Sequence, residues 1–234
     1  MEKTIFFAPD ISSTNELPTD EGQHCIKVLR KKVGDEILIA DGKGFFYDAV
    51  ITLANAKHCE VEIINKMETG KQWGFNLQMA FAPTKNIDRI EWFVEKATEI
   101  GIDHLSPILC RNSERKDIKP QRIERILISA MKQSQKAVLP QLDEMEPFAS
   151  FVKKDFAGRK FIAHCYEGEK RLLNSVYRKG ENALILIGPE GDFSQEEVQM
   201  AIDSGFEPIS LGESRLRTET AALVACNTIH VLNG

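Results

Sequence analysis

The sequence predicts an α/β protein with a β-rich N-terminal domain over residues 1–70 and a larger α/β domain with a mostly parallel sheet over residues 71–234. Three observations predict this division. Apolar runs rich in β-branched and aromatic residues dominate the first part, strand-like and helix-like patterns alternate in the second, and the polar stretch "ETGK" at residues 68–71 separates them. The length of 234 residues suits one large or two small domains, at roughly 100–200 residues each.

In the N-terminal region, two apolar runs flank the turn sequence "DGKG" at residues 41–44. An Asp-Gly turn between such runs is typical of a β-hairpin, which we expect over residues 35–53. The run "HCEVEIINKM" at residues 58–67 supplies a further strand.

Beyond residue 71 the chain alternates between predicted strands and helices. The helix over residues 86–101, for example, places Ile87, Ile90, Val94 and Ala97 on one stripe and ends at Gly101. The predicted strands are 75–82, 104–110, 160–165, 183–188 and 207–212, and the predicted helices are 86–101, 121–134, 170–180, 194–205 and 221–232. This alternation implies βαβ units and a parallel sheet covered on both faces.

Composition excludes several classes of protein. Residues are 42% hydrophobic and 28% charged, and no apolar run approaches the ~18 residues that span a bilayer. The N-terminus lacks the pattern of a signal peptide, so we expect a cytoplasmic protein. The five cysteines are scattered without metal-ligand spacing, so we expect reduced, mostly buried thiols and no metal.

Basic residues cluster in two segments of a chain whose net charge is −5. Residues 111–136 contain eight basic and three acidic side chains. The second cluster contains Lys27, Arg30, Lys31 and Lys32. Each cluster alone is consistent with a solvated face or with binding of nucleic acid.

The loop "GPEGDF" at residues 188–193 follows a predicted strand and precedes a helix that begins with a capping box, Ser194 and Glu197. Glycines permit close approach of a ligand to the backbone. A phosphate loop is disfavoured, because Glu190 and Asp192 would repel phosphate and no Gly-Lys-Ser/Thr follows. A cationic or neutral ligand such as S-adenosylmethionine fits better, and a tight turn without any ligand is the alternative.

The stretch "GESRLRTETA" at residues 212–221 is the second polar loop after a predicted strand. In an extended segment Arg215 and Arg217 point the same way, whereas Leu216 points oppositely, toward the core. Thr218 or Thr220 can cap the last helix. Guanidinium groups suit RNA phosphate or a nucleobase carbonyl, which favours an RNA-facing role for the arginines.

Together, "LILIGPEGDFSQEEV" and "SLGESRLRTETAAL" closely resemble the paired C-terminal motifs of RsmE-type 16S ribosomal RNA (uridine-N3) methyltransferases of the SPOUT superfamily. Further similarity runs through "HCIKVLRKKVGDEILIADGKGFFYDAVI", "EKATEIGIDHLSPILCRNSERK" and "AMKQSQKAVLPQL", so the resemblance covers nearly the whole chain.

The resemblance implies an N-terminal PUA-like β-barrel that helps to bind RNA and a C-terminal SPOUT domain whose chain forms a trefoil knot, a rare exception among folds. It also implies a homodimer that holds S-adenosylmethionine in the knot. The implied reaction is methylation of N3 of uridine 1498 in 16S rRNA of the small ribosomal subunit.

By position, ten residues match the family's cofactor loops: Leu186, Ile187, Gly188, Glu190, Gly191, Leu211, Ser214, Leu216, Arg217 and Thr218. The chain departs from the pattern at Asp192, where a second glycine is usual, and at Arg215, where isoleucine is usual.

N3 of uridine carries a proton at neutral pH, so methylation requires its removal or stabilisation of the resulting anion. We expect Arg217 to stabilise the uracil anion or orient the base, with Glu190 or Glu219 as a possible proton acceptor. Glu219 can equally be a first-turn carboxylate favoured by the helix dipole. The residues expected to contact RNA are Lys27, Arg30, Arg111, Arg115, Arg122 and Arg125. The alternatives are a non-catalytic RNA-binding, ribosome-associated protein and a SPOUT methyltransferase for another RNA site or for ribose 2′-OH.

Overall fold

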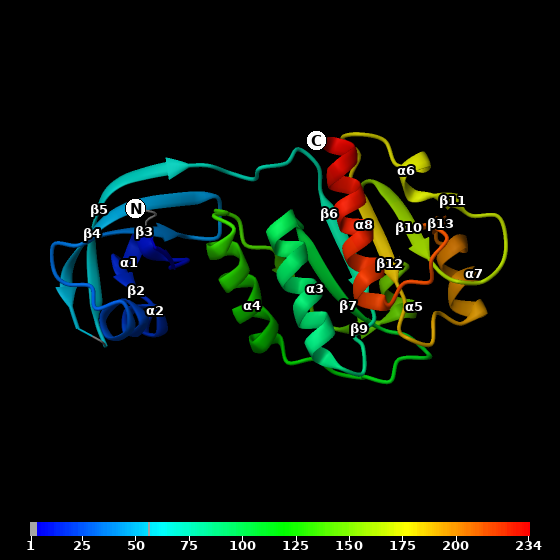
Figure 1. The fold of residues 1–234 in the computed structure, drawn as a ribbon, viewed down its shortest axis with the longest axis horizontal. Helices are drawn as coiled ribbons and strands as arrows, with labels where there is room; N and C mark the ends of the chain where they lie inside the picture. The colour runs from blue at the N-terminus through cyan, green and yellow to red at the C-terminus, as the bar shows by residue number, and fades with distance from the viewer. Residues whose placement is uncertain (1–3, 56) are drawn as a thin grey trace. The chain divides into compact units, whose positions relative to one another are not determined.

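The structure, a computed structural model, describes residues 4–55 and 57–234 and consists of two compact units (Figure 1). The first unit contains Met1–Gln72 together with Ile128–Leu139, and the second contains Trp73–Leu127 and Pro140–Gly234. The chain therefore enters the second unit, returns to the first in the second half of helix α4 (Pro120–Gln133), and leaves it again.

The first unit contains a five-stranded sheet in the order β1-β3-β4-β5-β2. Its strands are β1 Ile5–Phe7, β2 Glu16–Leu17, β3 Glu36–Ala40, β4 Phe45–Ala54 and β5 Cys59–Glu68. Short helical segments connect β1, β2 and β3, namely α1 Ile11–Thr14, α2 Thr19–Gln23 and the π-helix η1 His24–Val28. The sheet is antiparallel except for the parallel pair β1 and β3. Its buried core includes Phe6, Ile39 and Tyr47.

The predicted hairpin is confirmed, since β3 and β4 pair antiparallel across the "DGKG" turn. Gly42 and Gly44 have φ values of 73° and 109°, which glycine adopts without strain. The Asp41 carboxylate accepts backbone N–H groups from Lys43 at 2.7 Å and Phe45 at 3.1 Å. The Asp41 side chain therefore holds the turn that the sequence predicted.

The second unit contains an eight-stranded sheet in the order β11-β13-β10-β12-β6-β7-β8, with β9 paired to β7. Its strands are β6 Leu77–Phe81, β7 His104–Leu109, β8 Gln141–Leu142, β9 Glu146–Pro147, β10 Arg159–Ala163, β11 Arg171–Leu172, β12 Ala183–Ile187 and β13 Glu207–Ser210. Its other helices are α3 Ile87–Ile100, α5 Phe148–Phe151, α6 Leu173–Val176, α7 Gln195–Asp203 and α8 Thr218–Asn233. Every strand pair in this sheet is parallel, which confirms the predicted α/β architecture.

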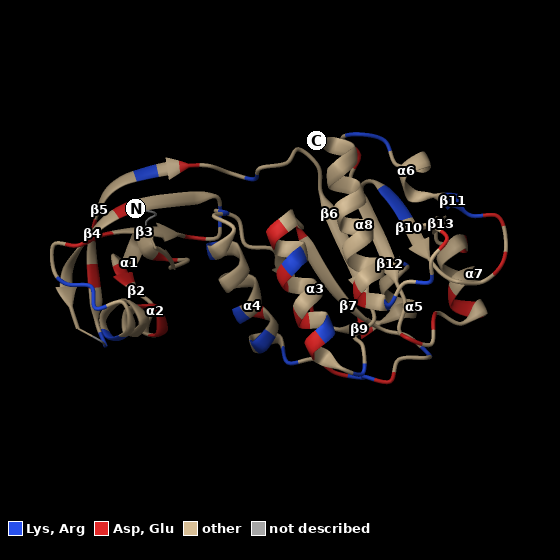
Figure 2. Ribbon diagram, in the orientation of Figure 1, with Lys and Arg blue, Asp and Glu red and all other residues tan. Residues whose placement is uncertain are grey.

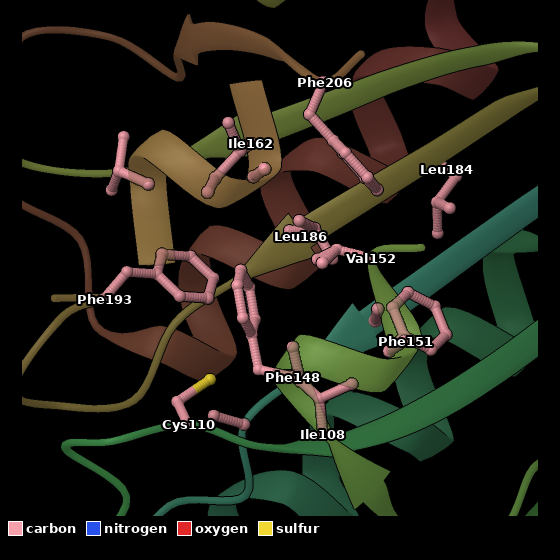
Figure 3. Packing of buried hydrophobic residues seen from close by; sticks show 14 residues of the cluster. Ile108, Cys110, Phe148, Phe151, Val152, Ile162, Leu184, Leu186, Phe193 and Phe206 are labelled. Carbon is pink, nitrogen blue, oxygen red and sulfur yellow. The ribbon is translucent and has the colours of Figure 1, made fainter. Parts of the chain in front are cut away.

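Alternating residues of the central strands pack on opposite faces of this sheet. On one face Phe81 of β6 meets Phe93 of α3, with ring centroids 5.4 Å apart, and α8 lies beside α3 (Figure 1). On the other face Leu186 of β12 packs with Phe148 of α5 and Phe193, the residue that leads into α7 (Figure 3). Helices on both faces therefore bury the sheet, as expected for parallel strands.

The predicted helix over residues 170–180 is wrong. Arg171 and Leu172 instead form β11, which pairs with the end of β13, and only the single turn of α6 follows. A short isolated helix is only marginally stable, whereas pairing with β13 gives Arg171 and Leu172 backbone hydrogen bonds to a neighbouring strand. Tertiary contacts therefore override the local helical pattern.

Four of the five cysteines are buried and Cys165 is exposed, so the expected reduced, mostly buried thiols are confirmed. None of the helices in the described ranges combines the length and apolar character required to span a bilayer.

Candidate functional site

The site lies where three neighbouring parallel strands end. In the order β13-β10-β12, Ala163 at the end of β10 is in register with Ile187 of β12 and Ile209 of β13. The loops that follow these strands therefore start at the same level and converge. Ligands of open α/β sheets bind beyond the carboxyl ends of the strands, so this edge is the expected place for one.

Two adjoining cavities, of about 290 Å³ and 360 Å³, occupy this edge. The first is lined by Ala163, Cys165, Ile187, Gly188, Pro189, Glu190, Asp192, Arg215, Leu216, Arg217, Thr218 and Ala221. The second is lined by Ala163, His164, Cys165, Lys170, Ala221 and the segment 209–216. Because five residues line both, we describe them together as the cleft. Its size is that of a small-molecule site.

The loop at residues 188–193 is packed tightly against its surroundings. A Cβ at Gly188 would lie 3.1 Å from the backbone nitrogen and ring of Phe193, so a side chain here would be crowded unless Phe193 shifted by a few tenths of an ångström. The Asn112 amide donates to the backbone oxygens of Gly191 at 3.2 Å and Asp192 at 3.1 Å. These contacts hold the loop in one conformation.

The predicted capping box at the start of α7 is confirmed. The Ser194 hydroxyl accepts the Glu197 backbone N–H at 3.2 Å, and the Glu197 carboxylate accepts that of Ser194 at 2.8 Å. Glu197 also accepts the backbone N–H of Arg111 at 2.8 Å, which ties the segment after β7 to this helix.

The second loop is joined to the first by a buried hydrogen bond. The Thr218 hydroxyl donates to the backbone oxygen of Gly188 at 3.0 Å, across thirty positions of sequence. The expectation that Thr218 or Thr220 caps the last helix is wrong, because Arg217 is the N-cap residue and makes no side-chain cap bond. The Thr218 hydroxyl instead serves the contact between strand ends.

Leu216 lines the cleft together with Arg215 and Arg217. It is half-buried there, so the expectation that its side chain belongs to the core is wrong, while its direction relative to the arginines stays a prediction. Both arginines are exposed and form the rim of the cleft.

The two candidate proton acceptors lie in different environments. Glu190 is exposed, lines the cleft and accepts the backbone N–H of Lys85 at 2.9 Å. Glu219 is buried in the first turn of α8, outside the cleft lining, with one carboxylate oxygen 3.9 Å from Nε of Arg89. The structure therefore brings Glu190, and not Glu219, to the cleft with Arg217.

Eight of the ten residues carried over from the family motifs line the cleft. The other two are Leu186, whose side chain belongs to the core on the opposite face of the sheet, and Gly191, which lies against Asn112. Sequence reasoning missed the end of β10 and the loop that follows it, which contribute Ala163, His164 and Cys165. This loop joins the site because β10 lies between β13 and β12, and no motif in the sequence indicates that strand order.

Burial lowers the pKa of His164, and the nearby Lys170 ammonium lowers it further. The imidazole is therefore neutral at neutral pH. Lys170 also donates to the backbone oxygen of His164 at 2.8 Å, so it fixes the loop after β10. No group of three His, Cys, Asp or Glu side chains within residues 4–55 and 57–234 could hold a metal ion.

Two of the arginines expected to contact RNA make extensive contacts within the protein. The Arg115 guanidinium donates to the backbone oxygens of Thr84 at 3.0 Å and Lys85 at 2.7 Å. Arg122 pairs with Glu91, with a nitrogen–oxygen distance of 2.7 Å. Arg115 therefore holds the segment before α3, and Arg122 holds α3 itself.

The remaining four candidates lie at the surface. Arg111 pairs with Glu196 at 3.2 Å, and both side chains are well exposed. Arg125 is exposed on the first half of α4, where Figure 2 shows basic positions in the helix and in the loop before it. Lys27 and Arg30 are exposed in the first unit, at the end of η1 and just beyond it.

Comparison with protein families gives two matches. Residues 71–230 match the family described as an RNA methyltransferase domain, and residues 17–64 match an RNA methyltransferase PUA domain. The chain is 28% identical over 243 aligned residues to a Synechocystis protein named ribosomal RNA small subunit methyltransferase E, covering 99% of this chain and 78% of that protein.

Solved structures give the same result. A probable rRNA-methyltransferase from Porphyromonas gingivalis is 45% identical, with a TM-score of 0.93 and coverage of 98% of both chains. A ribosomal RNA small subunit methyltransferase E from Neisseria gonorrhoeae, bound to S-adenosyl methionine, is 25% identical, with a TM-score of 0.85 and coverage of 99% of this chain and 98% of that one.

Proposed function

Since the chain belongs to the RNA methyltransferase family, whose domain it matches over residues 71–230, we propose that it uses S-adenosylmethionine to methylate RNA of the small ribosomal subunit. The observation that carries this proposal is the cleft itself. Three loops that follow adjacent parallel strands converge there, and two of them are the motifs that resemble the family's cofactor loops.

The residues of the cleft fit this cofactor. Ile187, Pro189 and Leu216 offer apolar surface for an adenosyl group. Glu190 and Asp192 place carboxylates beside the same cavity, which suits a ligand with a cationic sulfonium and repels phosphate.

The finer features of the proposal rest on the resemblance. We propose N3 of uridine 1498 in 16S rRNA as the acceptor atom, a homodimer as the active form, a trefoil knot around the cofactor, and the cytoplasm as the location. In the same way we propose that residues 1–70 act as a PUA-like RNA-binding domain and residues 71–234 as the SPOUT domain.

When bound, the cofactor supplies an electrophilic methyl group, and the protein must hold an N3 from which the proton has been removed. Arg217, exposed at the rim of the cleft, is placed to stabilise negative charge that spreads onto the uracil oxygens. Of the two candidate acceptors for the N3 proton, Glu190 is the better placed because it lines the cleft. Glu219 is better suited to stabilising the start of α8, because it is buried there beside Arg89.

The test is incubation of small subunits that lack the modification with the protein and a labelled methyl donor, followed by nucleoside analysis of the 16S rRNA. We expect labelled N3-methyluridine, with fully modified subunits as the control that accepts no label. Labelled 2′-O-methyl nucleosides would contradict the proposed acceptor atom. Binding of the donor without any transfer would instead identify a non-catalytic RNA-binding protein.

A further inference from the structure

We propose that Asp192 makes the cleft selective for charge, so that it binds the cationic methyl donor in preference to the neutral thioether product. This inference rests on the proposed function, because it takes S-adenosylmethionine to be the ligand of the cleft. It assigns Asp192 a role in cofactor discrimination and product release.

The backbone at Asp192 is unusual. Its φ is 61°, in the left-handed region that glycine adopts freely and most other residues avoid. Asp and Asn tolerate this region better than other side chains do, but still less well than glycine. A carboxylate therefore occupies a position where a residue without a side chain would be less strained, and such outliers often mark functional sites.

The carboxylate of Asp192 is held at both oxygens. Oδ1 accepts the backbone N–H of Phe193 at 2.8 Å, and Oδ2 accepts that of Cys165, in the loop after β10, at 2.7 Å. Phe193 is fully buried and its ring packs against Phe148 with centroids 5.4 Å apart (Figure 3). The charge is therefore fixed at the lining of the cleft and needs no reorganisation when a ligand binds.

The charges that line the first of the two cavities are divided between two loops. Glu190 and Asp192 come from the loop after β12, whereas Arg215 and Arg217 come from the loop after β13. Glu190 is exposed, so solvent screens it strongly, whereas Asp192 is half-buried and is screened less. Asp192 is thus the stronger source of negative potential for a ligand inside the cleft.

The chemistry of methyl transfer gives this charge a consequence. The lone pair of a deprotonated ring nitrogen forms the new N–C bond, and the electrons of the S–C bond remain on sulfur. A sulfonium cation thereby becomes a neutral thioether, and the negative charge of the nucleophile disappears. The attraction between Asp192 and the ligand therefore ends with the reaction, which favours exchange of the product for new donor.

Asp192 could instead serve only to connect two loops through its hydrogen bonds. The variant Asp192→Asn removes the charge and tolerates positive φ, but it keeps only one acceptor oxygen and therefore one of the two hydrogen bonds. Thermal unfolding and the affinity for the neutral compound report the lost hydrogen bond, whereas the affinity for the cationic compound also reports the lost charge. Asp203→Asn is the matched control, since Asp203 is an exposed carboxylate on α7 that lies outside the cleft lining.

The experiment is calorimetric titration of the full-length protein with S-adenosylmethionine and with S-adenosylhomocysteine, together with thermal unfolding. For Asp192→Asn we expect the Kd of the cationic compound to rise about three- to tenfold, as for a partly screened charge pair. The Kd of the neutral compound should stay within about twofold, and Asp203→Asn should change neither. Raising the salt concentration should reduce the discrimination of the unsubstituted protein more than that of Asp192→Asn, which keeps only the charge of Glu190 on this loop.

Equal weakening of both compounds would show that Asp192 only supports the loops, and unchanged affinities would show that its charge is irrelevant. Either result overturns the inference while the proposed function stands. If the unsubstituted protein binds neither compound, the proposed function fails and this inference fails with it.

Discussion

Replacing Thr218 by valine tests whether the hydrogen bond between the loops that follow β12 and β13 shapes the cleft. Thr218 is 6% exposed, and its hydroxyl donates to the buried backbone oxygen of Gly188 at 3.0 Å. Valine has nearly the same shape but no donor, so the variant leaves this carbonyl without the bond at a cost of about 1–3 kcal/mol. For a unit of this size, that corresponds to a fall in melting temperature of roughly 2–10 °C.

The assay combines calorimetric titration with S-adenosylmethionine and thermal unfolding of Thr218→Val, with Thr218→Ser as the matched control because serine keeps the hydroxyl. We expect Thr218→Val to lose stability and to bind the cofactor several-fold more weakly. Thr218→Ser should lose less stability and less cofactor affinity. If the valine variant is as stable as the serine variant and binds equally well, the hydrogen bond has no role in holding the loops together.

Three further predictions follow from the site and its surroundings. Arg217→Ala should reduce the rate of methyl transfer by about 10²–10³-fold and change the cofactor affinity by no more than a few-fold. The control Arg178→Ala, at an exposed position outside the cleft lining, should have little effect on either. Single-turnover assays measure the transfer rate, and a loss below tenfold contradicts the role of Arg217. Lys27→Gln and Arg30→Gln should each weaken binding to small subunits. The slope of log K against log salt concentration should become shallower by about 0.7–0.9 for each phosphate that the protein no longer neutralises. An unchanged slope excludes phosphate binding by these two side chains. Burial lowers the pKa of His164 below its ordinary 6.5, so the unfolded chain binds a proton at this imidazole more readily than the folded protein does. The free energy of unfolding should therefore fall as the pH drops through and below 6.5. Urea unfolding of His164→Gln should show a free energy of unfolding that depends less on pH.

The long periodic segments of this chain are predictable because their local pattern and their tertiary contacts agree. The helix predicted over residues 86–101 is α3. Ile90, Val94 and Ala97 of its predicted stripe are buried, and Ile87 in the first turn is half-buried. The segment 170–180 shows the limit of such reasoning, because two residues that suit a helix locally pair instead with the end of β13. That pairing joins residues far apart in sequence, so no local pattern encodes it.

The candidate site was predictable to the extent that it follows from local motifs. The loops at 188–193 and 212–218 are the walls of the cleft, as their polar and glycine-rich character indicated. Side-chain direction was less accessible, since Leu186 lies within a matching motif but faces the opposite side of the sheet. The loop after β10 could not be predicted, because it joins the site only through the strand order β13-β10-β12.

The strand order also explains how a chain of net charge −5 can present opposite charges to two reactants. In the first of the two cavities, one loop carries Glu190 and Asp192 and the other carries Arg215 and Arg217, and the paired ends of β10, β12 and β13 bring these loops together. In the reaction proposed above, the first loop would attract a cationic methyl donor and the second an anionic uracil, so the two reactants would be drawn to opposite sides of the cavity. The overall charge does not reveal this arrangement, because the four side chains cancel in the sum and differ only in the strand that each follows.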